Sequence, residues 1–328
     1  MNELERFKNK VKGITNESFE AHAIELFQYQ ADNNSVYRQY LNNLNFDTKS
    51  VSSLEDIPFL PIEFFKNHNV VCGNWSSEFY FQSSGTTNST RSKHQVQDLS
   101  FYREHALDTF KRVFKDFNKN DVVLALLPSY QAQSNSSLIC MVDHFMDQVK
   151  ESDYCLENFT LLGERINRYL NSDRSVYLFG VGYALLDFAE KSTSKIDGLK
   201  IIETGGMKGR RAEMTKEEYY NLLKNNLGEI SILSEYGMTE LMSQAYSLKE
   251  ANYTCAHSMK VLVRDPVDPF SKPYHNKTGV LNVIDLANVH SCAFIETQDL
   301  GKVQENGQFQ VLGRLDNSDL RGCNLLVQ

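Results

Sequence analysis

Residues 122–127 read Val-Val-Leu-Ala-Leu-Leu, an apolar run without a polar interruption. A run of this length is typical of a strand that is buried on both faces. Three shorter runs follow at residues 176–179, 199–202 and 230–233. Amphipathic segments that predict helices lie near residues 101–114, 137–148, 156–170, 183–191 and 216–223. Because strands and helices alternate, the sequence predicts an α/β fold with a mostly parallel sheet flanked by helices.

The regions on either side of this core show other patterns. Residues 17–30 have apolar side chains at helical spacing after Asn16, which we expect to cap a helix. We expect Pro61 to lie in the first turn of a short helix near residues 62–66. After residue 256, short apolar segments with Gly turns predict strands. The sequence thus predicts a helical segment at 1–75, an α/β core at 76–255, a β-rich subdomain at 256–312 and a tail at 313–328.

Composition narrows the class of protein. The 328 residues carry 34 basic and 42 acidic side chains, and this net charge of −8 argues against a nucleic-acid-binding protein. The most apolar stretch, residues 176–186, is well short of the roughly 20 residues that cross a bilayer. The start of the chain has no signal-peptide pattern. The six cysteines form no CxxC pair, so we expect neither disulfides nor a cysteine metal site, and a cytoplasmic location.

The most unusual stretch is residues 81–93, Phe-Gln-Ser-Ser-Gly-Thr-Thr-Asn-Ser-Thr-Arg-Ser-Lys. Backbone N–H groups and hydroxyls of such a loop can bind phosphate oxygens, and Arg91 or Lys93 can add positive charge. The same composition is also typical of a solvated surface loop, and the spacing is not that of a Walker A loop. From the residues alone, a phosphate-binding loop and an ordinary surface loop both remain open.

Two turns that contain glycine directly follow predicted strands. They read Thr-Gly-Gly at 204–206 and Glu-Tyr-Gly-Met-Thr-Glu at 235–240. The carboxyl ends of parallel strands converge on one crevice, so we expect both turns to border the same site. Gly205 and Gly206 permit close approach to a flat ring, Tyr236 offers a stacking face, and Glu240 is a hard oxygen ligand suited to Mg²⁺. Taken singly, each is equally an ordinary strand-to-helix turn.

Taken in order, these segments resemble the adenylate-forming superfamily of acyl and aryl ligases. Residues 83–87 are similar to its Ser/Thr/Gly phosphate loop, residues 204–206 to its adenine-side glycine turn, and residues 236–240 to its YGxTE motif. Residues 297–301, Thr-Gln-Asp-Leu-Gly, resemble its T-x-D-x-G ribose motif, and residues 313–316, Gly-Arg-Leu-Asp, its GRxD hinge. The chain departs from the family at Asn88, Thr90 and Arg91, where Gly, Pro and Lys are usual.

The end of the sequence narrows the resemblance. Acyl-CoA ligases of the superfamily continue past the hinge into a lid domain with a catalytic lysine, whereas this sequence ends twelve residues after Asp316, so we expect no lid. Together with Arg-Gly-Cys-Asn-Leu-Leu at 321–326, this ending resembles the LuxE-type acyl-protein synthetases. The family implies ATP-dependent formation of an acyl-adenylate from a fatty acid or other carboxylic acid. It also implies capture of the acyl group on a cysteine near the C-terminus, a position that only Cys323 occupies, and delivery to an acyl-protein reductase or acyl carrier.

The resemblance also implies a role for each motif residue. The ATP phosphates would be bound by Ser83, Ser84, Gly85, Thr86 and Thr87, with positive charge from Arg91 or Lys93. The α-phosphate would contact Thr239, and Mg²⁺ would be held by Glu240. The adenine would be bordered by Gly205, Gly206, Tyr236 and Gly237. The ribose hydroxyls would bind Asp299, with Arg314 nearby.

Two other functions remain open from the sequence. One is an acyl- or aryl-CoA ligase, similar to the phenylacetate-type ligases, which would share the adenylation step. The other is a non-catalytic relative that binds a nucleotide or an acyl-adenylate. The presence of Thr239, Glu240, Asp299 and Arg314 argues against loss of activity.

Overall fold

The structure is a computed structural model. It describes residues 3–83, 91–128, 135–155, 158–205, 210–212, 214–248 and 251–315. The chain divides into two compact units. Unit 1 comprises Met1–His105, Thr239–Ser243 and Thr254–Gln328, and unit 2 comprises Ala106–Met238 and Gln244–Tyr253.

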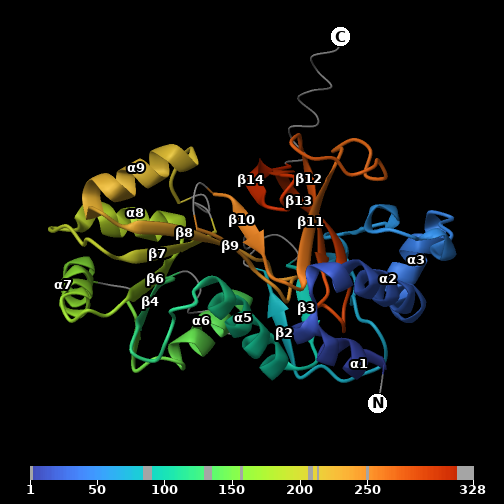
Figure 1. Ribbon diagram of the computed structural model, residues 1–328, viewed down its shortest axis with the longest axis horizontal. Coiled ribbons are helices and arrows are strands. Elements are labelled where there is room, and N and C mark those ends of the chain that lie inside the picture. Colours follow the sequence, from blue (N-terminus) through green and yellow to red (C-terminus); the bar gives the residue numbers. More distant parts are fainter. Residues whose placement is uncertain are drawn as a thin grey trace, which may run out of the picture. The chain divides into compact units, whose positions relative to one another are not determined.

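Unit 2 is built on a parallel sheet, as the sequence predicts. From one edge its strands are β5 (Glu151–Tyr154), β4 (Val122–Leu126), β6 (Val176–Gly180), β7 (Lys200–Thr204) and β8 (Ser231–Tyr236), followed by the antiparallel β9 (Ala245–Ser247) (Figure 1). The four strands predicted from apolar runs are confirmed. Strand β5 was not predicted, because its sequence Glu-Ser-Asp-Tyr is polar and mostly exposed at the edge of the sheet.

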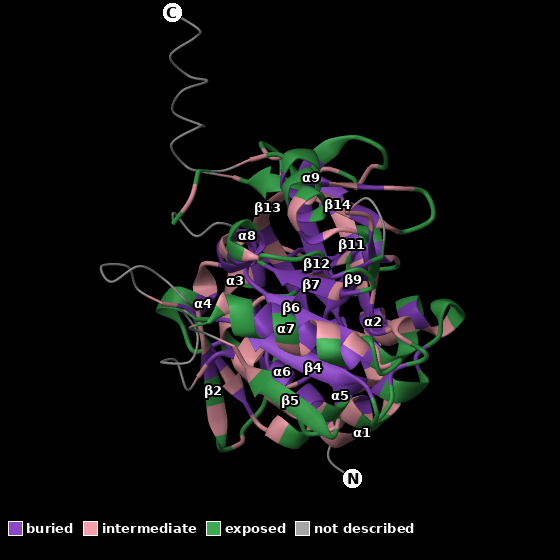
Figure 2. Cartoon of the chain, turned by 90° about the vertical axis from the view of Figure 1, so that its left-hand side faces the viewer, coloured by how far each residue is buried: buried purple, intermediate pink, exposed green. Residues whose placement is uncertain are grey.

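Four helices connect these strands: α6 (Ser137–Met146), α7 (Phe159–Leu170), α8 (Gly182–Lys191) and α9 (Lys216–Leu227). Helices α8 and α9 lie on one face of the sheet and α6 on the other (Figure 1). Strands β4 and β6 are buried along their whole length (Figure 2), as expected for strands covered on both faces. The predicted α/β fold class is therefore confirmed.

Unit 1 contains the β-rich region that was predicted after residue 256. Its antiparallel strands are β11 (Met259–Arg264), β12 (Thr278–Asp285), β13 (Phe294–Val303) and β14 (Phe309–Arg314). The short β1 (Leu60–Pro61) pairs in parallel with β13, and β10 (Tyr253–Cys255) precedes them in the sequence. A separate hairpin consists of β2 (Phe79–Gln82) and β3 (Lys93–Val96).

The first part of the chain is helical, with two differences from expectation. The helices are α1 (Glu3–Lys10), α2 (Asn16–Asn33), α3 (Ser35–Asn43), α4 (Phe64–Asn67) and α5 (Leu99–Val113), with short 3-10 turns at Val11–Gly13, Thr48–Ser50 and Leu54–Asp56. The cap of α2 is Thr15 rather than Asn16, because the Thr15 hydroxyl accepts the N–H of Ser18. Pro61 belongs to β1 and not to a helix, because Leu60 and Pro61 pair with β13.

Two further findings concern membrane-spanning helices and cysteines. No helix in the described ranges is long and apolar enough to cross a bilayer. The five described cysteines are free of disulfides. Scattered cysteines without a CxxC pair predict small buried side chains for every cysteine except Cys323. Cys72, Cys140 and Cys292 are buried, whereas Cys155 and Cys255 are half-buried, so the prediction is wrong for these two.

Candidate active site

The hairpin of β2 and β3 carries the predicted phosphate loop. The Ser83 N–H donates to the Ser92 carbonyl over 3.1 Å, and the Ser92 N–H donates to the Ser83 hydroxyl over 3.0 Å. These two bonds continue the hairpin register, in which Gln82 pairs with Lys93. Both ends of the loop are therefore tied to each other. Ser84, Gly85, Thr86 and Thr87 lie outside the described residues.

Glu240, the predicted magnesium ligand, lies beside the base of this loop. Only 5% of Glu240 is exposed. Burial raises the pKa of Glu240, while the Ser92 hydroxyl and the positive charges of Arg314 and Lys66 oppose that rise. The structure thus brings the loop base and the acidic end of the 236–240 motif together within unit 1.

The main chain of the same motif is bound by two side chains that the sequence did not single out. The His94 Nδ1–H donates to the Thr239 carbonyl over 2.9 Å, and the Asn288 Nδ2 donates to the Glu240 carbonyl over 2.7 Å. Ser92 and His94 are two residues apart on the hairpin, so they share a face. One face of this hairpin arm therefore lies against the turn at residues 239–240.

A buried carboxylate, Asp285 at the end of β12, anchors the next residues. It accepts hydrogen bonds from the backbone N–H groups of Met242 (2.7 Å), Ser243 (2.9 Å) and Ala287 (3.1 Å), and from the Ser243 hydroxyl (2.6 Å). Burial raises its pKa and these hydrogen bonds oppose that rise. The available signal was an acidic residue closing the apolar run 280–285, Val-Leu-Asn-Val-Ile-Asp.

The two predicted ribose-side residues lie opposite each other. Asp299 on β13 pairs with Arg314 on β14 in the antiparallel register. The Thr297 hydroxyl accepts the Asp299 N–H over 3.0 Å and donates to the Leu281 carbonyl over 2.7 Å, so the motif threonine fixes the strand. Asp299 is half-buried and Arg314 is exposed. An acceptor carboxylate and a guanidinium are thereby placed at one end of two paired strands.

The two candidate cations of the loop differ in position. Arg91 is half-buried and precedes Ser92 directly, at the loop base. The exposed Lys93 places its Nζ 5.4 Å from the centre of the Tyr80 ring. Since Lys93 alternates with Ser92 and His94, it lies on the opposite face of the hairpin. The positive charge of Lys66 near Glu240 was not predicted from the sequence.

The adenine-side residues belong to unit 2. Gly205 follows β7 with a φ of 72°, a conformation that favours glycine, and Gly206 lies outside the described residues. Tyr236 ends β8 and is only 8% exposed, with its ring centre 5.9 Å from that of Tyr253. A Cβ on Gly237 would lie 2.3 Å from Glu235 Oε1, so this glycine leaves room for that carboxyl, whose pKa burial raises to about 8.

This fold is that of the adenylate-forming acid ligases. The structure resembles an open conformation of 2-hydroxyisobutyryl-CoA ligase in complex with 2-HIB-AMP and CoA, with a TM-score of 0.69 and 12% identity, over 92% of this chain and 71% of the ligase. It also resembles a putative long-chain-fatty-acid CoA ligase from Rhodopseudomonas palustris, with a TM-score of 0.53 and 11% identity, over 74% of this chain and 60% of that one.

A match to a protein-family model identifies the class of ligase more closely than these structural similarities do. The chain belongs to the LuxE family of acyl-protein synthetases, whose model matches residues 13–328. The protein is therefore an ATP-dependent acid ligase. A comparison with curated proteins finds no match.

Proposed function

We propose that the enzyme activates a fatty acid as an acyl-adenylate and then transfers the acyl group to a cysteine thiol. In the first step a carboxylate oxygen attacks the α-phosphorus of ATP, and the bond to pyrophosphate breaks. In the second step the thiol first loses its proton. The resulting thiolate attacks the carbonyl carbon of the mixed anhydride, and AMP leaves. Because carboxylate and ATP are both anions, the first step depends on positioning and on neutralisation of charge.

The observation that carries this proposal is the contact between the hairpin at the loop base and the turn that bears Glu240, made by the 2.9 Å hydrogen bond from the His94 Nδ1–H to the Thr239 carbonyl. The Ser92 hydroxyl and the charges of Arg314 and Lys66 act on the buried Glu240 carboxylate. Donors for phosphate, an oxygen ligand for a cation and nearby positive charge are the groups that adenylate formation requires. Asp299 on β13 and Arg314 on β14 lie opposite each other, and this pair supports a ribose-binding role for the two strands.

The other nucleotide contacts follow from the motifs. The phosphates would be bound by Ser83, Ser84, Gly85, Thr86 and Thr87, with Arg91 or Lys93 adding charge. Thr239 would contact the α-phosphate. The adenine would lie against Gly205, Gly206, Tyr236 and Gly237.

Glu240 fits a magnesium site. Mg²⁺ is usually bound through one or two carboxylates together with substrate phosphates and water, so a single carboxylate suffices. Within the described part of the chain, no three His, Cys, Asp or Glu side chains form a metal-binding group, which fits a cation held largely by the nucleotide. Mg²⁺ bound there would neutralise phosphate charge. It would also keep Glu240 ionised against the effect of its burial.

We propose Cys323 as the first acyl acceptor, with a partner protein such as an acyl reductase or acyl carrier as the next. Four of the five described cysteines are poor candidates, because burial raises the thiol pKa of Cys72, Cys255 and Cys292 to about 12 and that of Cys155 to about 11. A thiol must lose its proton to attack the anhydride. Residues 313–328 would then serve as the tail that carries the acyl group.

ATP–pyrophosphate exchange with a panel of carboxylic acids tests the first step. We expect exchange that depends on Mg²⁺ and is fastest with fatty acids of one range of chain length. Absence of exchange with every acid would favour a non-catalytic binding protein instead. Incubation with labelled fatty acid should then give a protein-bound label that hydroxylamine releases. Rapid turnover to acyl-CoA on addition of coenzyme A, without such a label, would identify a CoA ligase.

A further inference from the structure

The segment Thr239–Ser243 lies in unit 1 without forming a helix or strand there. Its main-chain groups therefore need partners other than a regular hydrogen-bond ladder. Four of them are bound by three side chains. The carbonyls of Thr239 and Glu240 accept from His94 and Asn288, and the N–H groups of Met242 and Ser243 donate to Asp285. Side chains thus determine the path of this segment.

The backbone of Asn288 is itself held by hydrogen bonds on both sides. Its N–H donates to the Asp285 carbonyl over 2.9 Å, and its own carbonyl accepts from Gln30 Nε2 of α2 over 3.0 Å. Asn288 is 1% exposed. A side chain fixed at its backbone in this way loses little further freedom when it binds the Glu240 carbonyl, so its hydrogen bond has a defined direction.

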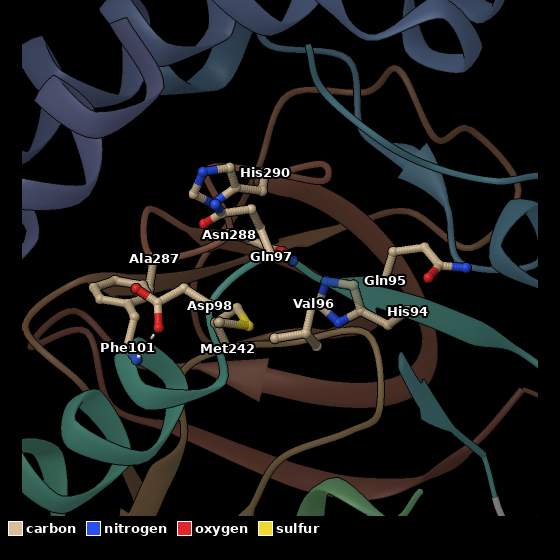
Figure 3. A pocket seen from close by; sticks show the side chains of 10 residues that line it. All are labelled: His94, Gln95, Val96, Gln97, Asp98, Phe101, Met242, Ala287, Asn288 and His290. Carbon is tan, nitrogen blue, oxygen red and sulfur yellow. Dashed lines mark hydrogen bonds between the residues drawn. The ribbon is translucent and has the colours of Figure 1, made fainter. Parts of the chain in front are cut away.

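His94 is held in place by its strand, by burial and by packing against an aromatic ring. It is 1% exposed, lies in β3, and packs its ring against Phe65 at 5.8 Å between ring centres. Burial lowers its pKa to about 4, so at neutral pH the ring is uncharged and donates through Nδ1. Figure 3 shows His94 and Asn288 lining one small pocket together with Met242 and His290. Neither His94 nor Asn288 adds charge beside Glu240, so any effect they have on it is geometric.

We propose that His94 and Asn288 are positioning residues of the adenylation step, which hold the main chain of Thr239 and Glu240 so that the Glu240 carboxylate lies beside the base of the phosphate loop. The proposal rests on the function proposed above for Glu240. It assigns a role in catalysis to two buried residues from separate parts of unit 1. Loss of either hydrogen bond would free the Glu240 main chain and weaken its hold on the nucleotide-bound cation.

Paired variants of His94 test this role. An asparagine amide can place a donor near the position of the histidine Nδ1–H, whereas leucine fills the space without a donor. We expect His94→Leu to lower the maximal pyrophosphate-exchange rate by about 10- to 100-fold, the scale of a misplaced catalytic group. It should also raise the Mg²⁺ concentration that gives half the maximal rate, with the KM for fatty acid unchanged. His94→Asn should restore most of both.

His290 provides a matched control, because it lines the same pocket while its carbonyl accepts the N–H of Cys72 and its ring packs against Trp75. His290→Leu should lower the melting temperature without moving the Mg²⁺ dependence. Asn288→Ala removes the donor to the Glu240 carbonyl and should shift the Mg²⁺ dependence in the same direction as His94→Leu. The Asn288→Ala variant therefore still tests the proposal if His94→Leu does not fold.

Two results would overturn the positioning role. In one, His94→Leu and Asn288→Ala change only the melting temperature and keep the Mg²⁺ dependence of the parent enzyme. In the other, His290→Leu moves that dependence as much as they do. Failure of the proposed function is distinguishable, because the unmodified enzyme would then show no exchange at all.

Discussion

Gly301 on β13 approaches Gln310 on β14 so closely that a Cβ on Gly301 would lie 2.3 Å from the Gln310 carbonyl oxygen. The register of the two strands shifts between Leu300 and Gly301, and only the pair of Leu300 and Gly313 separates this shift from the pair of Asp299 and Arg314. The absence of a side chain at Gly301 is therefore a condition for placing the ribose-side carboxylate opposite the arginine.

Gly301→Ala should destabilise the protein by about 1–3 kcal/mol, because the added methyl group meets backbone that cannot move aside easily. Weaker ATP binding should accompany the loss, since β14 carries Arg314. Gly313→Ala is the matched control on β14, where a Cβ would meet nothing within 4 Å, and it should stay within about 0.5 kcal/mol of the parent. Urea unfolding of both variants checks this, and equal stability of the two would contradict the packing argument.

Glu240→Gln should separate activity from stability. Removing the carboxylate charge should reduce pyrophosphate exchange by about 10²–10³-fold, as for other groups that stabilise charge at a reaction centre. Stability should be unchanged or slightly higher, because burial of Glu240 already opposes its ionised form. Parallel measurement of exchange and of urea unfolding decides the point. An active Glu240→Gln enzyme would remove Glu240 from the site.

Cys323→Ser should still form acyl-AMP while losing the hydroxylamine-labile acyl label. Serine keeps the size of the side chain and lacks a readily formed thiolate. Cys155→Ser is the control, since this half-buried thiol has a raised pKa and should not carry the label. The readout is pyrophosphate exchange alongside labelling with radioactive fatty acid. A label that persists in Cys323→Ser would place the acyl group on another residue.

Stability should fall as the pH drops below neutral, and His290 should account for part of the fall. Burial lowers the pKa of His290 to about 4, while an unfolded histidine titrates near 6.5. Between these values the unfolded chain takes up a proton that the folded chain does not. The contribution is therefore complete above about pH 6.5 and lost as the pH falls toward 4, by about 2–3 kcal/mol at most.

His290→Gln should flatten this pH dependence, measured as urea midpoints between pH 7 and pH 5. His275→Gln, which alters an exposed histidine, should leave the slope as in the parent. If the His290→Gln curve runs parallel to that of the parent, the half-buried His290 does not have a lowered pKa in the folded protein.

The sequence predicts the fold well where structure follows local patterns. Apolar runs locate β4, β6, β7 and β8, because a strand buried on both faces must be apolar throughout. The edge strand β5 carries no such pattern, since one side of it faces solvent. The sequence predicts a helix at Pro61, because proline is favoured in the first turn of a helix. The structure has a strand there instead, because Leu60 pairs with Ile295, more than 200 residues away.

The residues of the candidate site also fall into two groups, those that sequence motifs identify and those that only the fold brings to the site. Motif residues such as Thr239, Glu240 and Asp299 can be proposed from the sequence because the order of their motifs along the chain is distinctive. The residues that hold them were missed, because His94 and Asn288 resemble ordinary core positions until the fold brings them to the 239–240 turn. Such partners are specified by long-range packing, which no short window of sequence contains.

The tie between Ser83 and Ser92 has a consequence for how this family can diversify. Because two hydrogen bonds close the hairpin at the base of the loop, the register of β2 and β3 does not depend on which residues follow Ser83. The departures at Asn88, Thr90 and Arg91 can then accumulate without disturbing the strands that hold Glu240 in place. On the function proposed above, exchanging this loop for that of a relative should change how the ATP phosphates are bound while leaving the fold intact.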